Sequence, residues 1–486
     1  MRINHSIVAL LSRFRNHPSR RSEKTFKDEE YNFDVNVHRW DRFAWLAICL
    51  WVLSGLSGCL AQPASESVVD VVVLVPSGNE AAALHEAAVA YQNETGQVVR
   101  VETAGADVYG GKMEGLLLAG SSQYDLLYMP ASQLPLWISY QAIQPVAELV
   151  SPGVLKDNEE SQEKLRPWLR NLTYFDRIYG FPTQPALEAV WYRADLFQAA
   201  GLRAPTTWEA FRAAALALSQ PPERYGAALA AGEFDIGFEF GALLAGFGGK
   251  VFDEPSGLPD GNFDHFPVVS LTIEQPETQQ ALAYYAGLFQ ADGLAAPESL
   301  AGDRLSAAAA LQNGRAAMAI LPLTAAAPLL DCQVSPKICT SPESGEPQSL
   351  LAFTRLPGLP AGVTVGELGA WVIPLHAAHA QAAREFGAWL VSPSGAQVWA
   401  SASGIPAGLP DGDPTIIAKF PYLELLDGIN EYRLPYPPVK TDSLVGPVLR
   451  RGVHELAAGQ QDLPQVIYEM KEGLRSALYQ GGYTVK

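Results

Sequence analysis

The stretch IYGFPTQPALEAVWYRADLFQAAGLRAPTTWEAF, residues 178–211, decides how the rest of the chain is interpreted. Its centre, ALEAVWY at residues 186–192, is a short apolar run that is rich in β-forming side chains and is interrupted only by Glu188. Such a run predicts a buried strand rather than a helix. Glycine and proline at residues 180–185 predict a turn in front of this strand.

Two helices are expected after this strand. The first covers residues 195–200 and is closed by Gly201, a residue that tolerates the left-handed conformation found at helix C-termini. The second begins at Trp208, directly after Thr207, whose hydroxyl can cap a helix N-terminus. A strand followed by capped helices is typical of α/β proteins.

The first part of the chain predicts the same class of fold. Strands are expected at residues 68–75, 98–102 and 124–129, and helices between them. This β-α-β-α-β order predicts a doubly wound parallel sheet, in which ligands bind at the carboxyl ends of the strands. The residues at those ends are Ser77 to Glu80, Tyr109 and Pro130 to Ser132.

Six blocks of sequence, in order, resemble the extracellular solute-binding proteins of bacterial ABC importers, specifically the carbohydrate-type family 1, which is maltose-binding-protein-like. The blocks include YGFP…YRADLFQAAGL…PTTWE, the aromatic FDIGFEFGALLAGFGGKVFD, LQNGRAAMAI, and AAREFGAWLVSPSGAQVWASASGIP. The resemblance covers nearly everything after Val68. This sequence departs from the family pattern at two places. Leu321-Pro322-Leu323 stands where many members have Gly-Pro-Trp, and Glu367-Leu368-Gly369 replaces a common Gly-Gly-Trp.

The resemblance implies an α/β, two-lobed periplasmic-binding-protein fold of type II. Each lobe would be a mainly parallel sheet flanked by helices, and the chain would cross the hinge several times. Lobe 1 is expected to comprise residues 68–185 plus 368–408, and lobe 2 residues 186–367 plus 409–486.

The N-terminus predicts export. Basic residues precede the apolar run FAWLAICLWVLSGLSG, residues 43–58, which is too short for a comfortable membrane span but suits a signal peptide. Small residues before Cys59 resemble a bacterial lipobox, so residues 1–58 are expected to be a signal peptide with a long n-region. Cys59 would then carry the lipid and residues 59–67 would be a flexible tether. The alternative is an ordinary signal peptide or anchor with a chance cysteine.

Composition limits the partners. The chain has 34 basic and 52 acidic residues, a net charge of −18, and such a surface repels nucleic acid. Cys332 and Cys339 bracket a short polar segment, which in an exported protein suggests a local disulfide. No HExxH motif or zinc spacing is present, so neither a metal nor a cofactor is expected.

Eight residues at strand and loop ends are candidates for contacting a solute, since polyols are held by aromatic faces and by polar side chains. Each has an alternative role. Asn79 could cap its helix, Glu80 could stabilise a helix N-terminus, and Glu188 could be bonded to an arginine. Glu239 could lie on a solvated helix face, and Trp371 could fill the core. The candidates are Asn79, Glu80, Tyr109, Gln184, Glu188, Glu239, Glu367 and Trp371.

The resemblance implies a lipid-anchored, monomeric binding protein that closes around a sugar or oligosaccharide and delivers it to a membrane permease. Hinge closure would be its mechanism, without covalent chemistry. A non-sugar solute, a sensor partner or an exported hydrolase stay open as alternatives. The search for a nucleophile elbow, a P-loop and a Cys-His motif finds none, whereas dispersed carboxylate pairs cannot be recognised from sequence.

Overall fold

The computed structural model describes residues 69–148, 159–233, 235–258, 267–340, 345–402, 404–407 and 414–486, which belong to one compact unit of residues 67–486. The predicted leader, the tether and Cys59 lie outside the described residues. In the described part of the chain, no helix is long and apolar enough to cross a bilayer.

The predicted β-α-β-α-β unit is confirmed. Strand β1 (Val71–Pro76) lies between β2 (Val99–Ala104) and β3 (Leu126–Pro130), and both pairs are parallel. Helices α2 (Asn79–Thr95) and α3 (Ala106–Leu118) connect the strands. β1 is buried along almost its whole length, which explains its continuous run of apolar residues.

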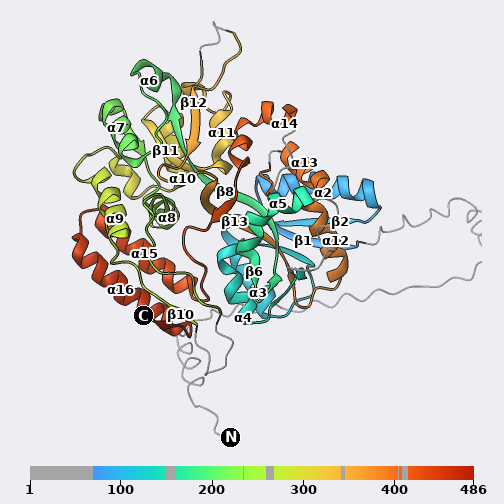
Figure 1. Cartoon of the computed structure of the whole chain (residues 1–486). Coiled ribbons are helices and arrows are strands. Elements are labelled where there is room, and N and C mark those ends of the chain that lie inside the picture. Colours follow the sequence, from blue (N-terminus) through green and yellow to red (C-terminus); the bar gives the residue numbers. More distant parts are fainter. Residues whose placement is uncertain are drawn as a thin grey trace, which may run out of the picture. The chain divides into compact units, whose positions relative to one another are not determined.

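Two long strands form the middle of the sheet. β8 (Phe181–Arg193) and β13 (Val363–Pro374) pair antiparallel within a ten-stranded sheet whose main order is β2-β1-β3-β13-β8-β11-β9 (Figure 1). Among the described strands of this sheet, every antiparallel pair involves β8 or β13, and all other pairs are parallel. These two strands therefore join two parallel α/β halves.

The predicted turn at residues 180–185 is wrong, because β8 already begins at Phe181. Pro182 and Pro185 lie inside the strand, opposite Ala370 and Leu368 of β13. The pairing register shifts between Leu368 and Gly369. Prolines are tolerated at such an irregularity, because a residue without an N–H loses least where the regular ladder is already interrupted.

Strand β8 changes partners between two neighbouring residues. Leu187 pairs with Gly366 of β13, whereas Glu188 pairs with Pro322 of β11 (Ala316–Pro322). The chain thus passes from one half of the sheet to the other at this point. The lobe boundaries given above stay a prediction.

The second half of the sheet is formed by β11 with β9 (Tyr225–Ala228) and β12 (Leu351–Arg355). Helix α7 (Trp208–Leu218) packs on β9 and begins after Thr207, whose hydroxyl accepts a hydrogen bond from the Ala210 amide, as predicted. The other large helices of this half are α8 (Ile236–Gly246), α9 (Pro276–Phe289), α10 (Arg304–Gln312), α15 (Asp442–Ala457) and α16 (Leu463–Gln480).

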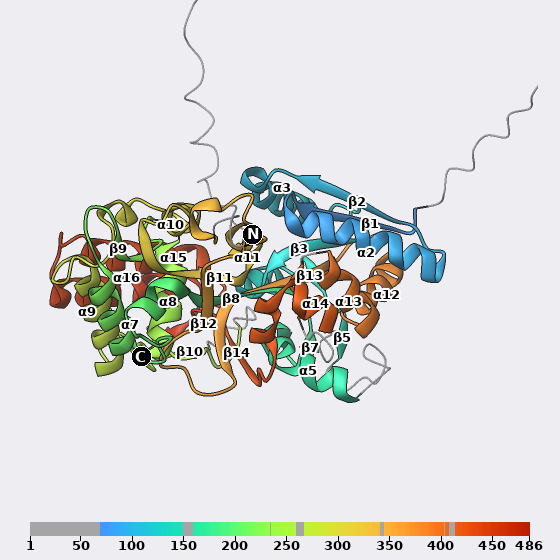
Figure 2. The ribbon, with the colours of Figure 1, turned by 90° about the horizontal axis from the view of Figure 1, so that it is seen from above.

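Two hydrophobic cores support the two halves. One surrounds β1 to β3, and the other lies between α8, α9, α15 and α16. Both views show α2, α12 and α13 beside the first strands and α7, α9 and α16 in the other half (Figure 1, Figure 2). Strand β8 serves both cores: Trp191 belongs to the first and Val190 to the second, because neighbouring side chains of a strand point to opposite faces.

Shorter elements complete the chain. The helices are α4 (Leu134–Ser139), α5 (Glu159–Leu169), α6 (Ala194–Ala199), α11 (Ala326–Leu330), α12 (Ala380–Leu390), α13 (Pro393–Ser401) and α14 (Pro414–Lys419). The strands are β4 (Ile143–Gln144), β5 (Ala147–Glu148), β6 (Thr173–Tyr174), β7 (Arg177–Ile178), β10 (Val268–Val269), β14 (Glu431–Arg433) and β15 (Thr484–Val485).

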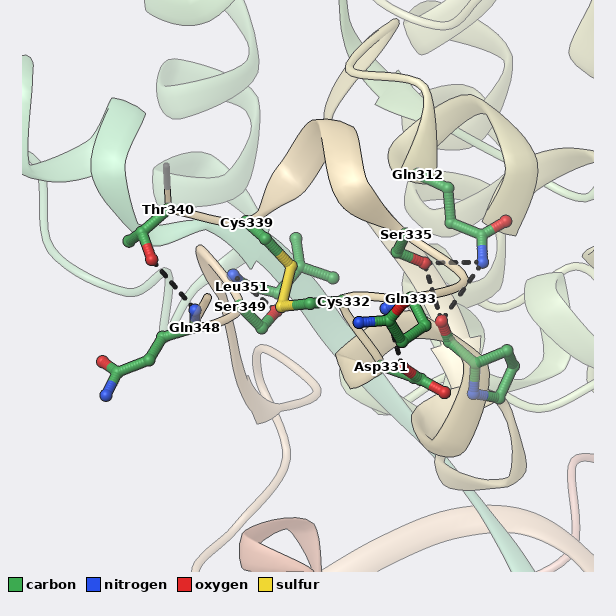
Figure 3. Close-up of a disulfide and its surroundings, with 11 residues drawn as sticks. Gln312, Asp331, Cys332, Gln333, Ser335, Cys339, Thr340, Gln348, Ser349 and Leu351 are labelled. Carbon is green, nitrogen blue, oxygen red and sulfur yellow. Dashed lines mark hydrogen bonds between the residues drawn. A yellow bond between two sulfur atoms is a disulfide. The ribbon is translucent and has the colours of Figure 1, made fainter. Parts of the chain in front are cut away.

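A disulfide closes the segment between α11 and β12. Cys332 and Cys339 are bonded, with their Cα atoms 5.8 Å apart, which confirms the predicted local pair (Figure 3). Inside the closed loop, Ser335 donates a hydrogen bond to the Pro328 carbonyl and accepts one from the Gln312 amide group (Figure 3). The loop is therefore attached to both α10 and α11.

Candidate functional site

A pocket lies where the two halves of the sheet meet. The first half contributes the residues that follow β3, and β13 contributes Glu367 and Leu368. The second half contributes Phe238 of α8 and Asp442, the first residue of α15. The complete lining is Pro130, Ala131, Ser132, Phe238, Glu367, Leu368, Leu434, Pro435, Tyr436 and Asp442. The pocket thus lies at the carboxyl end of β3, where a doubly wound sheet places its ligands.

Arg304 organises the charged wall beside this pocket. Its Nη2 lies 2.7 Å from Glu188 Oε1 on β8, and its Nη1 lies 2.9 Å from Glu367 Oε2 on β13. Its Nε lies 3.9 Å from Asp235 Oδ1, just before α8, and its guanidinium lies 5.0 Å from the centre of the Phe238 ring. One arginine therefore ties both long strands to the start of α8.

Local helix signals hold Arg304 in place. It is the first residue of α10, and the preceding Asp303 is the N-cap, whose carboxylate accepts a hydrogen bond from the Ser306 amide at 2.8 Å. The backbone amide of Arg304 donates to Asp235 Oδ2 at 2.9 Å. The helix start thus fixes the backbone of Arg304, and the carboxylates described above hold its guanidinium group.

Glu188 is bonded to an arginine, which was one of its two predicted roles. Its side chain is 1% exposed, and Arg304 is its ion-pair partner. Burial raises the pKa of the Glu188 carboxyl to about 7, although the positive charge of Arg304 acts in the opposite direction. The pair is therefore a buried link between α10 and β8, which together with β13 we call the hinge strands.

Glu239 is neither exposed on a helix face nor in the pocket lining. It is buried, and it accepts hydrogen bonds from the Tyr285 hydroxyl at 2.7 Å and from the Ala230 amide at 2.8 Å. Burial raises the pKa of this carboxyl to about 8, whereas the two hydrogen bonds lower it. Among its charged neighbours, Glu188 raises that pKa and Arg304 lowers it.

Replacement of Glu239 by glutamine is expected to flatten the pH dependence of stability. The carboxyl pKa rises from 4.5 to about 8 on folding, so the folded chain retains a proton that the unfolded chain has lost between these values. The wild-type free energy of unfolding should therefore fall as pH rises from about 5 to 8, by up to about 1.4 kcal/mol per pH unit. Between pH 7 and 8 the fall should be smaller in Glu239→Gln, as measured by urea denaturation. Glu277→Gln, at an exposed position of α9, is the control; identical slopes in Glu239→Gln and wild type would contradict the assignment.

The other sequence candidates lie in different surroundings. The structure describes the backbone of Asn79 and Gln184, at the start of α2 and within β8, but not their side chains. Tyr109 is buried, and its hydroxyl donates to the Tyr128 carbonyl at 2.7 Å. Trp371 is 1% exposed and packs edge-on against Tyr128 and Trp399. Whether any of these residues contacts a solute stays a prediction.

Tyr128, on β3, is a buried tyrosine affected by two of the candidate carboxylates. Burial raises the pKa of the Tyr128 hydroxyl, and the negative charges of Glu367 and Glu80 raise it further. The charges of two candidate carboxylates, one on β13 and one in the first turn of α2, therefore act on the same tyrosine. Sequence reasoning missed Tyr128, which occupies the middle of an apolar strand that gives no sign of a polar neighbour.

Asp442 is a second residue that sequence reasoning missed. It is partly buried and lines the pocket, and its carboxylate forms no hydrogen bond or ion pair with another residue that the structure describes. Burial raises the pKa of its carboxyl to about 6; Arg450 lowers it and Glu367 raises it. Asp442 is the first residue of α15, and its neighbours in the sequence, Thr441 and Ser443, give no sign that it faces a pocket.

A larger pocket, of about 290 Å³, shares Leu434, Pro435 and Tyr436 with the first one. It is lined by polar residues of both halves, including Arg170, Lys250, Glu254 and Arg433. It does not include the residues that follow β3 or the Arg304 partners. In the described part of the chain, no group of His, Cys, Asp and Glu could hold a metal ion.

The two-part sheet joined by β8 and β13, with a pocket between its halves, defines a two-lobed binding protein of the periplasmic type. The sequence profile of the bacterial extracellular solute-binding proteins matches residues 76–397, and the chain belongs to this family. A mannitol-binding protein of Pseudomonas aeruginosa is 32% identical over 138 residues, which are 27% of this chain. The alignment spans 30% of that relative's length.

Solved structures share the fold over nearly their full length. Maltose-bound MalE3 of T. maritima superposes with a TM-score of 0.66 at 21% identity, covering 84% of this chain and 99% of that one. MalE of Xanthomonas citri gives 0.65 at 17%, covering 84% and 97%. A solute-binding protein of Agrobacterium vitis with bound D-mannitol gives 0.61 at 21%, covering 85% and 99%.

Proposed function

We propose that this protein captures a sugar, a polyol or an oligosaccharide outside the cytoplasm and delivers it to the permease of an ABC importer. The observation that carries this proposal is the pocket at the hinge strands, whose walls come from both lobes. The mannitol-binding relative and the maltose- and mannitol-bound neighbours support a carbohydrate solute.

Closure of the lobes would act on the pocket through β8 and β13. Glu367 lies on β13 next to Gly366, where the two strands last pair, and Arg304 ties it to α10 of the second lobe. Bringing the residues after β3 toward Phe238 would enclose a solute between them. We propose that the protein works in this way as a monomer, without chemical turnover and without a cofactor.

A thermal-shift screen of the full chain in mild detergent tests the proposal. The probes are mono- and disaccharides, polyols, amino acids, polyamines and phosphate esters. At least one sugar or polyol should raise the melting temperature with its concentration, since a ligand at 100 times its Kd stabilises by about 2.7 kcal/mol. Chromogenic glycosides should not be hydrolysed. A shift with amino acids alone, or turnover of the glycosides, would contradict the proposal.

A pair of matched variants locates the binding site. Phe238→Ala removes an aromatic face from the pocket, and Phe175→Ala removes an exposed phenylalanine whose side chain lies outside the pocket lining. The sugar-induced shift should be lost or reduced in Phe238→Ala and retained in Phe175→Ala. The opposite result would place the site elsewhere.

We also propose that Cys59 carries a lipid that holds the protein on the outer face of the membrane. The sequence before Cys59 supports this proposal. Incorporation of labelled palmitate by the wild-type chain, and its loss in Cys59→Ser, would be the expected result. Labelling that is unchanged in Cys59→Ser would refute it.

A further inference from the structure

The side chains that line the pocket offer more hydrogen-bond acceptors than donors. Its two carboxylates belong to Glu367 and Asp442. Of the two hydroxyls, that of Tyr436 already donates to the Gly237 carbonyl at 2.8 Å, which leaves Ser132 as the one lining side chain with an uncommitted donor. The other lining side chains are apolar. A ligand that complements this pocket must therefore supply donors to the two carboxylates.

The charges around the pocket are also unbalanced. Arg304 is shared by three carboxylates, those of Glu188, Asp235 and Glu367. Asp442 adds a fourth carboxylate. The positive charge of Arg450 acts on it, but the two residues do not form an ion pair in the described part of the chain. Carboxyl groups thus outnumber guanidinium groups by four to two around the pocket, and the two that line it, Glu367 and Asp442, would repel an anionic ligand.

Asp442 lines the pocket with a carboxylate that has no partner among the described residues. Burial raises the pKa of this carboxyl to about 6, because the charged form is hydrated less well there than in open water. Closing the lobes over a neutral ligand would remove more water from this carboxylate and would raise the cost of keeping it charged. A positive group on the ligand would offset that cost directly.

We propose that the solute is a sugar or polyol that carries a protonated amine, and that its ammonium group lies between Asp442 and Glu367. The hydroxyl-bearing ring would then lie against Phe238 and the apolar residues Leu434 and Pro435. An ammonium group offers three donors and no acceptor, so it matches a wall of carboxylates better than a hydroxyl does. This inference rests on the proposed function and narrows its solute class.

Isothermal titration of the full chain at pH 7.5 tests the inference with matched pairs of probes. The pairs are D-glucosamine with D-glucose, D-galactosamine with D-galactose, 1-amino-1-deoxy-D-mannitol with D-mannitol, and chitosan disaccharide with cellobiose. N-acetyl-D-glucosamine serves as a neutral control. In a pair that binds, the amine should bind at least tenfold more tightly than its hydroxyl parent, and acetylation should remove this advantage.

Variants distinguish the inference from a general effect of negative charge. Asp442→Asn keeps the size of the side chain and should reduce the amine-to-hydroxyl affinity ratio to less than threefold. Glu277→Gln removes an exposed carboxylate in the first turn of α9, outside the pocket lining, and should leave the ratio unchanged.

The outcomes separate the inference from the proposed function. Hydroxyl parents that bind as tightly as their amines would overturn the inference and leave the proposed function standing. The same holds if the ratio persists in Asp442→Asn. If neither these probes nor the wider set of sugars binds, both the inference and the proposed function fail.

Discussion

Replacement of Arg304 by alanine is expected to lower the free energy of unfolding by about 3–5 kcal/mol, as measured by urea denaturation at pH 7.5. The change leaves the carboxylate of Glu188, 1% exposed, without its ion-pair partner at 2.7 Å, and it releases Glu367 on the neighbouring strand. Breaking one side of a buried pair is costly because the remaining carboxyl either keeps a charge that nothing solvates or takes up a proton, its pKa being raised further once the positive charge of Arg304 is gone. Sugar-induced stabilisation should weaken as well, because Glu367 lines the pocket.

Arg315→Ala is the matched control for this prediction. Arg315 pairs with Glu298 at the same distance of 2.7 Å, but these side chains are 52% and 55% exposed. Solvated pairs contribute about 0–1 kcal/mol, so the control should lose little stability. The double variant Arg304→Ala/Glu188→Gln should lose less than Arg304→Ala alone, because the buried charge is then absent. A loss below about 1 kcal/mol in Arg304→Ala would show that the ion pair between Arg304 and Glu188 does not stabilise the fold.

Elements whose signals are local could be predicted from the sequence. The β-branched run of β1, the Gly96 end of α2 and the Thr207 cap of α7 each depend on residues within a few positions of one another. The start of β8 could not, because it depends on pairing with β13, almost 190 residues later along the chain. A Gly-Pro-rich segment predicts a turn until the partner strand is known.

The candidate site also contains features that could be predicted from the sequence and features that could not. An acidic residue in an apolar strand predicts an arginine partner, and Glu188 has one, but its identity as Arg304 follows only from the fold, 116 positions away. Glu188, Glu239 and Glu367 were proposed on separate grounds, and the structure brings all three near this one arginine. Tyr128 and Asp442 were missed because their polarity matters only where β3, β13 and α15 meet.

The second large effect on stability is expected from a substitution in β13, one of the two hinge strands. Gly366→Ala is expected to destabilise the protein by about 1–3 kcal/mol. A Cβ atom at this position would lie 2.1 Å from the Ala186 carbonyl oxygen and 2.9 Å from the Leu187 Cα atom, so two backbone segments would have to separate. These are the residues where β8 leaves β13, so the displacement would move Glu367 relative to Arg304 and should weaken sugar binding as well.

The same substitution at Gly111 should have the opposite effect on stability. Gly111 lies inside α3, and a Cβ atom there would meet no other atom within 4 Å. Because alanine loses less backbone entropy than glycine when a helix forms, Gly111→Ala should raise the free energy of unfolding by about 0.5–1 kcal/mol. Chemical denaturation of both variants provides the comparison, and sugar titration follows the pocket. If Gly366→Ala were as stable as the wild type and bound sugar equally well, β8 and β13 would not be in close contact where the chain passes between the lobes.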